Sequence, residues 1–149
     1  MASPTTTDSV SIAMAAFSLP RLRFELLQQL QQQLRQLVES GTMPEFSDNP
    51  LLAKLEQLLP ELEQGEESAL FDAQQSISLL IANFPQLTPL VSRDLLWLLG
   101  GDCLHWMPEA EVELYQQLEE LYHQALEKGN DFDWVATRQQ LTTQPQGLH

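Results

Sequence analysis

The stretch LPRLRFELLQQLQQQLRQLVES, residues 19–40, decides the fold class of this chain. Its apolar residues recur at steps of three and four, which places them along one face of an α-helix. Ser18 before the stretch and Pro20 inside it are typical of a helix start, and Gly41 is typical of a helix end. We therefore predict a long amphipathic helix here. Its apolar stripe consists of Leu19, Leu22, Leu26, Leu30, Leu34 and Leu37.

The same periodicity continues beyond an expected loop at residues 42–49. A second helix should start at Pro50, and Pro60 should end or kink it because proline lacks a backbone N–H. A third helix is expected over residues 66–83. The Phe-Pro pair that follows should end this helix, since the residue before a proline avoids helical backbone angles. Each segment has one apolar face, which predicts packing between helices.

The segment LLWLL, residues 95–99, is a continuous apolar run at the centre of the expected fourth helix. A continuous apolar run covers more than one face of a helix, so we predict a central helix that is buried on most sides. The Thr-Pro pair at 88–89 is typical of its start. The glycine pair at 100–101 either breaks this helix or allows close backbone packing. We expect the helix to continue to about Trp106.

Two more helices complete the predicted fold. The fifth should start at Pro108 and stop at the Lys-Gly-Asn sequence of residues 128–130, and Asp131 should cap a short last helix. The chain has no alternating strand pattern and no Asn-Gly hairpin signal, which argues against a sheet. We therefore predict an all-α, single-domain bundle of five to six mostly antiparallel helices over residues 19–142. Residues 1–18 and 143–149 are expected to be flexible tails.

The charge of the chain limits its partners. The 149 residues have a formal net charge of -14, and the sequence pI is about 4.3. Residues 1–43 are neutral overall, so the acidic excess lies in residues 44–149. A surface this negative repels phosphate backbones and anionic lipids, which argues against direct nucleic-acid or membrane binding. It favours a basic protein partner, or it serves solubility alone.

The number of cysteines and the hydropathy of the chain indicate the cellular compartment of the protein. Cys103 is the single cysteine, so no intramolecular disulfide can form, which suits a reducing cytoplasm. The first residues lack the basic region of a secretory signal, and charged residues interrupt the most apolar stretch at 90–107. We expect a soluble cytoplasmic protein.

One cluster combines an acid, a thiol and an imidazole: Asp102, Cys103 and His105. On a continuous helix Asp102 and His105 face the same way, but the thiol does not reach the imidazole. A catalytic Cys–His pair therefore requires the preceding glycines to break the helix. The alternative is structural, with a packed thiol and an Asp–His pair on the helix surface. No metal-ligand spacing or cofactor motif accompanies the cluster, so we expect neither a metal nor a cofactor.

Two helix faces are candidate interaction surfaces. The fifth helix concentrates acidic residues that could bind a basic partner, although such runs are usually solvated faces. Its candidate partner-binding residues are Glu109, Glu111, Glu113, Glu119 and Glu120. The stripe of the first helix either belongs to the core or pairs with a second copy of the chain. The candidate dimerisation residues are Leu22, Leu26, Leu30 and Leu34.

Three functions remain open from sequence. The leading hypothesis is a non-enzymatic protein–protein interaction module with an acidic surface: an adaptor, a chaperone-like protein or a regulator. The first alternative is an acidic decoy of nucleic acid that blocks a basic protein surface. The second alternative is an enzyme or redox protein that uses Cys103 and His105.

Overall fold

The computed structural model describes residues 17–143, and within them every regular element is helical. The all-α prediction is confirmed for this range. The predicted tails lie almost entirely outside the described residues. The range 17–143 contains seven α-helices and two 3₁₀-helices, which is more than the five to six helices expected. The excess arises because one short helix occupies the predicted loop at residues 42–49 and because the predicted fourth helix is divided into three segments.

Helix α2, Leu19–Ser40, matches the prediction from its periodicity. The Ser18 hydroxyl accepts a hydrogen bond from the backbone N–H of Arg21 at 3.2 Å, which caps the first turn. Gly41 ends the helix with a φ of 72°, and its N–H donates to the Val38 carbonyl. The loop expected next contains a further short helix, α3, Pro44–Ser47, because Phe46 is fully buried and packs edge-on against Phe84.

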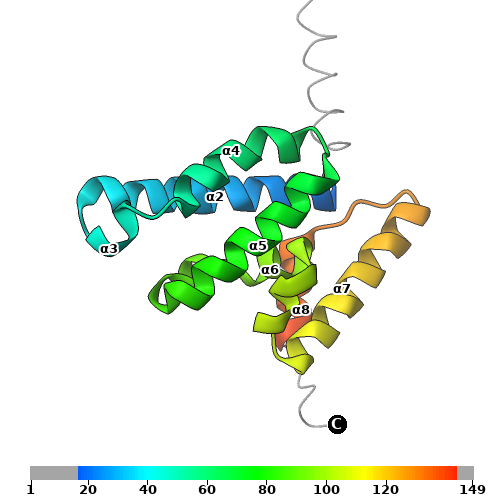
Figure 1. The fold of residues 1–149 in the computed structure, drawn as a ribbon. Coiled ribbons are helices and arrows are strands. Elements are labelled where there is room, and N and C mark those ends of the chain that lie inside the picture. The colour runs from blue at the N-terminus through cyan, green and yellow to red at the C-terminus, as the bar shows by residue number, and fades with distance from the viewer. Residues whose placement is uncertain (1–16, 144–149) are drawn as a thin grey trace, which may run out of the picture. The chain divides into compact units, whose positions relative to one another are not determined.

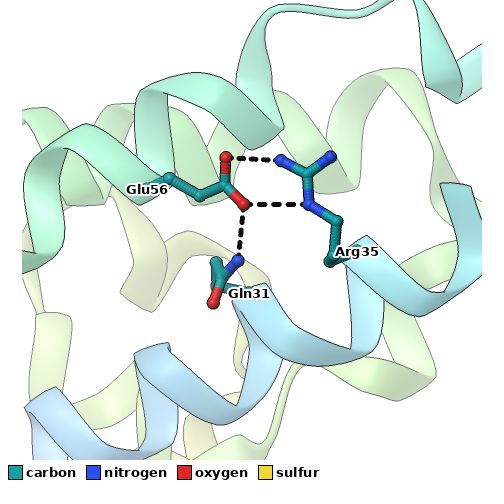
Figure 2. A network of polar contacts seen from close by, with 3 residues as sticks. All are labelled: Gln31, Arg35 and Glu56. Carbon is teal, nitrogen blue, oxygen red and sulfur yellow. Dashed lines mark hydrogen bonds and ion pairs between the residues drawn. The ribbon is translucent and has the colours of Figure 1, made fainter. Parts of the chain in front are cut away.

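Helix α4, Leu51–Glu63, runs beside α2 in the ribbon (Figure 1). Pro50 is the residue before the first turn, and the Asn49 side chain accepts from the Leu51 backbone N–H at 2.9 Å, which satisfies the first free N–H of the helix. Pro60 lies inside the helix, which continues to Glu63 instead of ending there. A polar network links the two helices, because the Glu56 carboxylate of α4 accepts hydrogen bonds from Gln31 and Arg35 of α2 (Figure 2).

Helix α5, Glu67–Asn83, is the best-connected helix of this region. It packs against α4, against the two 3₁₀-helices and against α6, and it buries Ala73, Ile77 and Leu80 completely. The central position that the sequence suggested for residues 95–99 therefore belongs to α5. Helix α5 has 17 residues and buries small side chains such as Ala69 and Ala73. It is therefore long enough to contact several shorter elements, and they can approach it closely.

The predicted fourth helix is instead three segments: η1 (Pro85–Leu90), α6 (Arg93–Leu99) and η2 (Gly101–Trp106). Ser92 starts α6, since its hydroxyl accepts from the Leu95 N–H at 3.0 Å. Gly100 ends it with a φ of 68°, and Gly101 follows at 54°. The expected continuation through the glycine pair is therefore wrong, because positive φ angles cannot propagate a right-handed helix.

The chain divides into two compact units, one ending at Trp106 and the other beginning at Met107. The second unit contains α7 (Glu109–Glu127) and α8 (Trp134–Thr143). Trp134 is 2% exposed and lies within 6.4 Å, ring centre to ring centre, of Tyr115, Tyr122 and Phe132. Asp133, and not the predicted Asp131, accepts the capping hydrogen bond of α8. That the two units fold as one domain stays a prediction.

Candidate functional site

A tight turn at residues 100–101 positions the Asp102–Cys103–His105 cluster. The Gln74 side-chain amide of α5 donates to the Leu99 carbonyl at 2.6 Å, which satisfies the end of α6. A Cβ atom at Gly101 would lie 2.7 Å from the Oε1 atom of Gln74, and the φ of 54° is itself unfavourable for other residues. Glycine is therefore required here, and α5 holds the turn in place.

The 3₁₀ geometry of η2 separates the three side chains of the cluster. A 3₁₀-helix has about three residues per turn, so Asp102 and His105 share one face. Both residues are exposed, whereas Cys103 is completely buried. The Asp102 carboxylate accepts a hydrogen bond from the Gln75 amide at 2.7 Å. The acid is thus fixed on the surface of the first unit, next to the middle of α5.

Cys103 has the environment of a core residue. Its thiol donates to the Gln74 carbonyl at a sulfur-to-oxygen distance of 3.5 Å. Burial raises the pKa of the thiol to about 11, with Asp102 adding to the rise and a hydrogen bond with Ser78 opposing it. The thiol is therefore protonated at neutral pH and is a poor nucleophile. The glycines do break the helix, but no hydrogen bond joins Cys103 to His105 among the described residues, so this geometry gives no support to a Cys–His pair.

A shallow hollow of about 270 Å³ opens beside the cluster, lined by Ser78, Asp102, His105 and Trp106. The Trp106 indole N–H donates to the Ser78 hydroxyl at 3.4 Å, and its ring meets the His105 ring edge to face at 5.3 Å. Arg93 donates to the Trp106 carbonyl at 3.1 Å and so anchors the end of η2. The hollow therefore presents a carboxylate beside two aromatic rings.

Two large apolar side chains are exposed on α5, the helix that supplies Ser78 to this hollow. Phe71 is 59% exposed and Leu79 is 50% exposed, and they lie one helical turn to either side of Gln75 on α5. Sequence reasoning missed them, although both fall outside the row of apolar residues that α5 uses for its core. We define the α5–η2 surface by Phe71, Gln75, Ser78, Leu79, Asp102, His105 and Trp106.

The structure divides the five glutamates predicted to bind a partner. Glu109, Glu113 and Glu120 are exposed and share one face of α7, where Glu127 extends the row. Glu111 and Glu119 are half-buried, and Glu119 lies 3.8 Å from the imidazole of His123. We define the α7 acidic stripe by Glu109, Glu113, Glu120 and Glu127.

The leucine stripe of α2 is also divided. Leu30 and Leu34 are at most 2% exposed and belong to the core of the first unit, so they are not accessible to a second chain in this structure. Leu22 and Leu26 are half-buried. A homodimer through α2 stays a prediction, and the part of the stripe open to it is the end near Leu22.

The described residues contain no candidate metal cluster and no candidate membrane-spanning helix. Within residues 17–143, no group of three or more histidine, cysteine or acidic side chains is placed to hold a metal ion. Over the same range, no helix combines the length and the apolar character that crossing a bilayer requires.

The described residues form an all-helical fold in which the short 3₁₀-helix η2 packs against the long helix α5 beside the hollow. The chain belongs to the PA2817-like family, whose model matches residues 17–148. This match includes all of the described helices. No curated protein and no solved structure matches the chain.

Proposed function

We propose that this protein is a non-enzymatic interaction module that binds another protein through the α5–η2 surface. The main support for this proposal is that Phe71 and Leu79 are exposed on either side of Gln75, whose amide is hydrogen-bonded to the Asp102 carboxylate. Single exposed apolar residues are common on protein surfaces, but apolar residues grouped with fixed polar residues are typical of binding sites. Adaptor, chaperone-like and regulatory roles are all consistent with such a surface.

The chemistry of this surface favours a basic amphipathic segment as the partner. Asp102 is already oriented by Gln75, so it can accept hydrogen bonds from a lysine or arginine without further ordering. Trp106 offers a ring on which a guanidinium can stack. Apolar residues of the segment would cover Phe71 and Leu79. The net charge of -14 would attract a basic partner over a longer range.

Site-specific photocrosslinking tests this proposal. A photoreactive amino acid at position 71 or 79 should crosslink one discrete partner in cells, and the same residue at position 126 or 135 is the matched control. Leu126 and Val135 are similarly exposed, at 54% and 45%, but lie outside the α5–η2 surface. Equal crosslinking at all four positions, or none at 71 and 79, would contradict the proposal.

The identified partner then allows a quantitative test. Replacing Asp102 by Asn should weaken its binding by about 10-fold, since a charge-assisted hydrogen bond contributes roughly 1.5–3 kcal/mol. Combined Phe71→Ser and Leu79→Ser replacements should weaken binding further. Leu126→Ser should leave the affinity unchanged, and a partner that lacks a basic segment would refute the assigned chemistry.

The α7 acidic stripe supports a second candidate, the acidic decoy of nucleic acid. Its four carboxylates extend over about 27 Å of helix, given a rise of 1.5 Å per residue, and α7 contains no lysine or arginine. A decoy complex should weaken steeply with rising salt. Glu109→Gln, Glu113→Gln and Glu120→Gln together should reduce that dependence, and Glu61→Gln with Glu63→Gln is the control. Salt-insensitive binding would rule the decoy out.

A further inference from the structure

Arg23 of α2 is a half-buried cation for which residues 17–143 supply no ion-pair partner. Its Nε atom is buried and makes no hydrogen bond, and among residues 17–143 no carboxylate forms an ion pair with it. The side chain lines a hollow of about 190 Å³ between the start of α2 and the end of α4. Pro20, Phe24 and Leu62 supply the apolar part of its wall.

A charged group in this position is unfavourable unless something compensates it, because burial removes hydrating water. Burial lowers the pKa of Arg23, but an arginine remains protonated at neutral pH. The nearby acids do not compensate it. Glu25 lies 3.3 Å from Arg21 instead, and Glu63 borders the same hollow but is exposed to solvent. None of the acidic residues within the described range forms an ion pair with Arg23.

We propose that this hollow binds a small organic monocarboxylate with an apolar body. The carboxylate would accept hydrogen bonds from the Arg23 guanidinium, whose planar fork matches a carboxylate in shape. The apolar body would rest against Phe24 and Leu62. This site is separate from the α5–η2 surface, and the inference is independent of the proposed function.

Size and charge both favour this ligand class. A cavity of about 150 Å³ accommodates a benzene molecule, so the hollow suits a ligand of about that size. Arg21 also borders the hollow, but its charge is paired with Glu25. A second negative charge on the ligand would therefore meet no further unpaired cation and would be repelled by Glu63, which borders the same hollow. A monoanion is therefore favoured over a phosphate dianion, and the apolar wall favours a ligand that is not wholly polar.

Benzoate is a suitable probe, with benzamide as its uncharged counterpart and inorganic phosphate as a second anion. In ¹H–¹⁵N NMR titrations of the full chain, benzoate should cause saturable shifts at the amides of Phe24, Leu62 and Gly65. Benzamide should cause none, and phosphate should bind at least several-fold more weakly. No saturable shifts with benzoate, or phosphate binding as tightly as benzoate, would overturn the assignment.

Variants separate Arg23 from its neighbours. Arg23→Gln should weaken benzoate binding at least 10-fold, and Arg23→Lys should weaken it less because the positive charge remains. Lys54→Gln is the control, because it removes a cation of α4 that does not line the hollow, and it should bind like the wild type. Glu63→Gln should tighten binding several-fold. Unchanged affinity in both Arg23 variants would overturn the proposal, and their NMR spectra would verify that each variant is folded.

Discussion

Two arginines of α2, Arg23 and Arg35, lie near the same helix, α4, but only Arg35 forms an ion pair with it. Arg35 donates to both oxygens of Glu56, at 3.0 and 2.5 Å, and Gln31 donates to the same carboxylate at 2.6 Å (Figure 2). Arg23, about 18 Å away along the helix axis, has no such partner within residues 17–143. The difference lies in α4, whose Glu56 carboxylate bonds Arg35 at one end of the interface, whereas at the other end Leu62 is buried and Glu63 is exposed to solvent.

This difference indicates two uses of the same residue type. Hydrogen bonds with Glu56 raise the pKa of Arg35, and those with Arg35 lower the pKa of Glu56, so the pair stabilises the contact between helices. The residues of the described range give Arg23 no comparable stabilising hydrogen bond or ion pair. Residues that cost stability in the native state are often retained for binding, which is how we interpret Arg23.

The largest change in stability is expected from a substitution in the buried core of α2, between Arg23 and Arg35. Leu34 is fully buried, so Leu34→Ala should lower the free energy of unfolding by about 2–5 kcal/mol through lost burial and a residual cavity. Leu22→Ala, at a half-buried position, should cost much less. Urea denaturation of both variants measures the difference. Equal losses would mean that the leucine stripe is not divided as described.

Glu56→Gln should leave Arg35 without its carboxylate partner, as Arg23 is within residues 17–143. The lowered pKa of Glu56 means that its contribution to stability is present above the carboxyl pKa of the unfolded chain, about 4.3. That contribution is lost as the pH falls through the lower pKa of the folded state. The variant should therefore be less stable at pH 7 and should lose less stability than the wild type on acidification. Parallel pH profiles in thermal denaturation would contradict this.

Arg23→Met should have the smallest effect and the opposite sign. It removes an unpaired, half-buried charge and retains apolar packing, so the free energy of unfolding should stay unchanged or rise by up to about 1 kcal/mol. Arg35→Met is the matched comparison and should destabilise the chain. Calorimetry on the two variants compares them directly, and a clear loss of stability in Arg23→Met would show that Arg23 has a structural role.

The sequence predicted the α2 helix well and residues 85–106 poorly, for physical reasons. The α2 stripe has a clear helical period and a capping residue at each end, so local information is sufficient. The run at 95–99 has no period, and its limits depend on Ser92 and on the positive φ angles of the two glycines. Whether a glycine pair is tolerated in a helix depends on neighbours such as Gln74, which is distant in sequence.

The candidate sites were less predictable than the fold. Asp102 and His105 stood out as a cluster, but the exposure of Phe71 and Leu79 depends on which face of α5 the other helices cover. The situation of Arg23 depends on the residues that α4 places opposite it, about 40 positions later. A sequence pattern indicates which residues are apolar or charged, but not which charged residue is left without a counterion.

The buried thiol of Cys103 allows local opening of the structure to be measured by its rate of chemical modification. Because the sulfur is fully buried and hydrogen-bonded to α5, an alkylating reagent can reach it only after η2 separates from that helix. The alkylation rate in native buffer therefore measures how often this separation occurs, with no label introduced. If a ligand on the α5–η2 surface holds the two elements together, it should slow alkylation even where its binding produces no other signal.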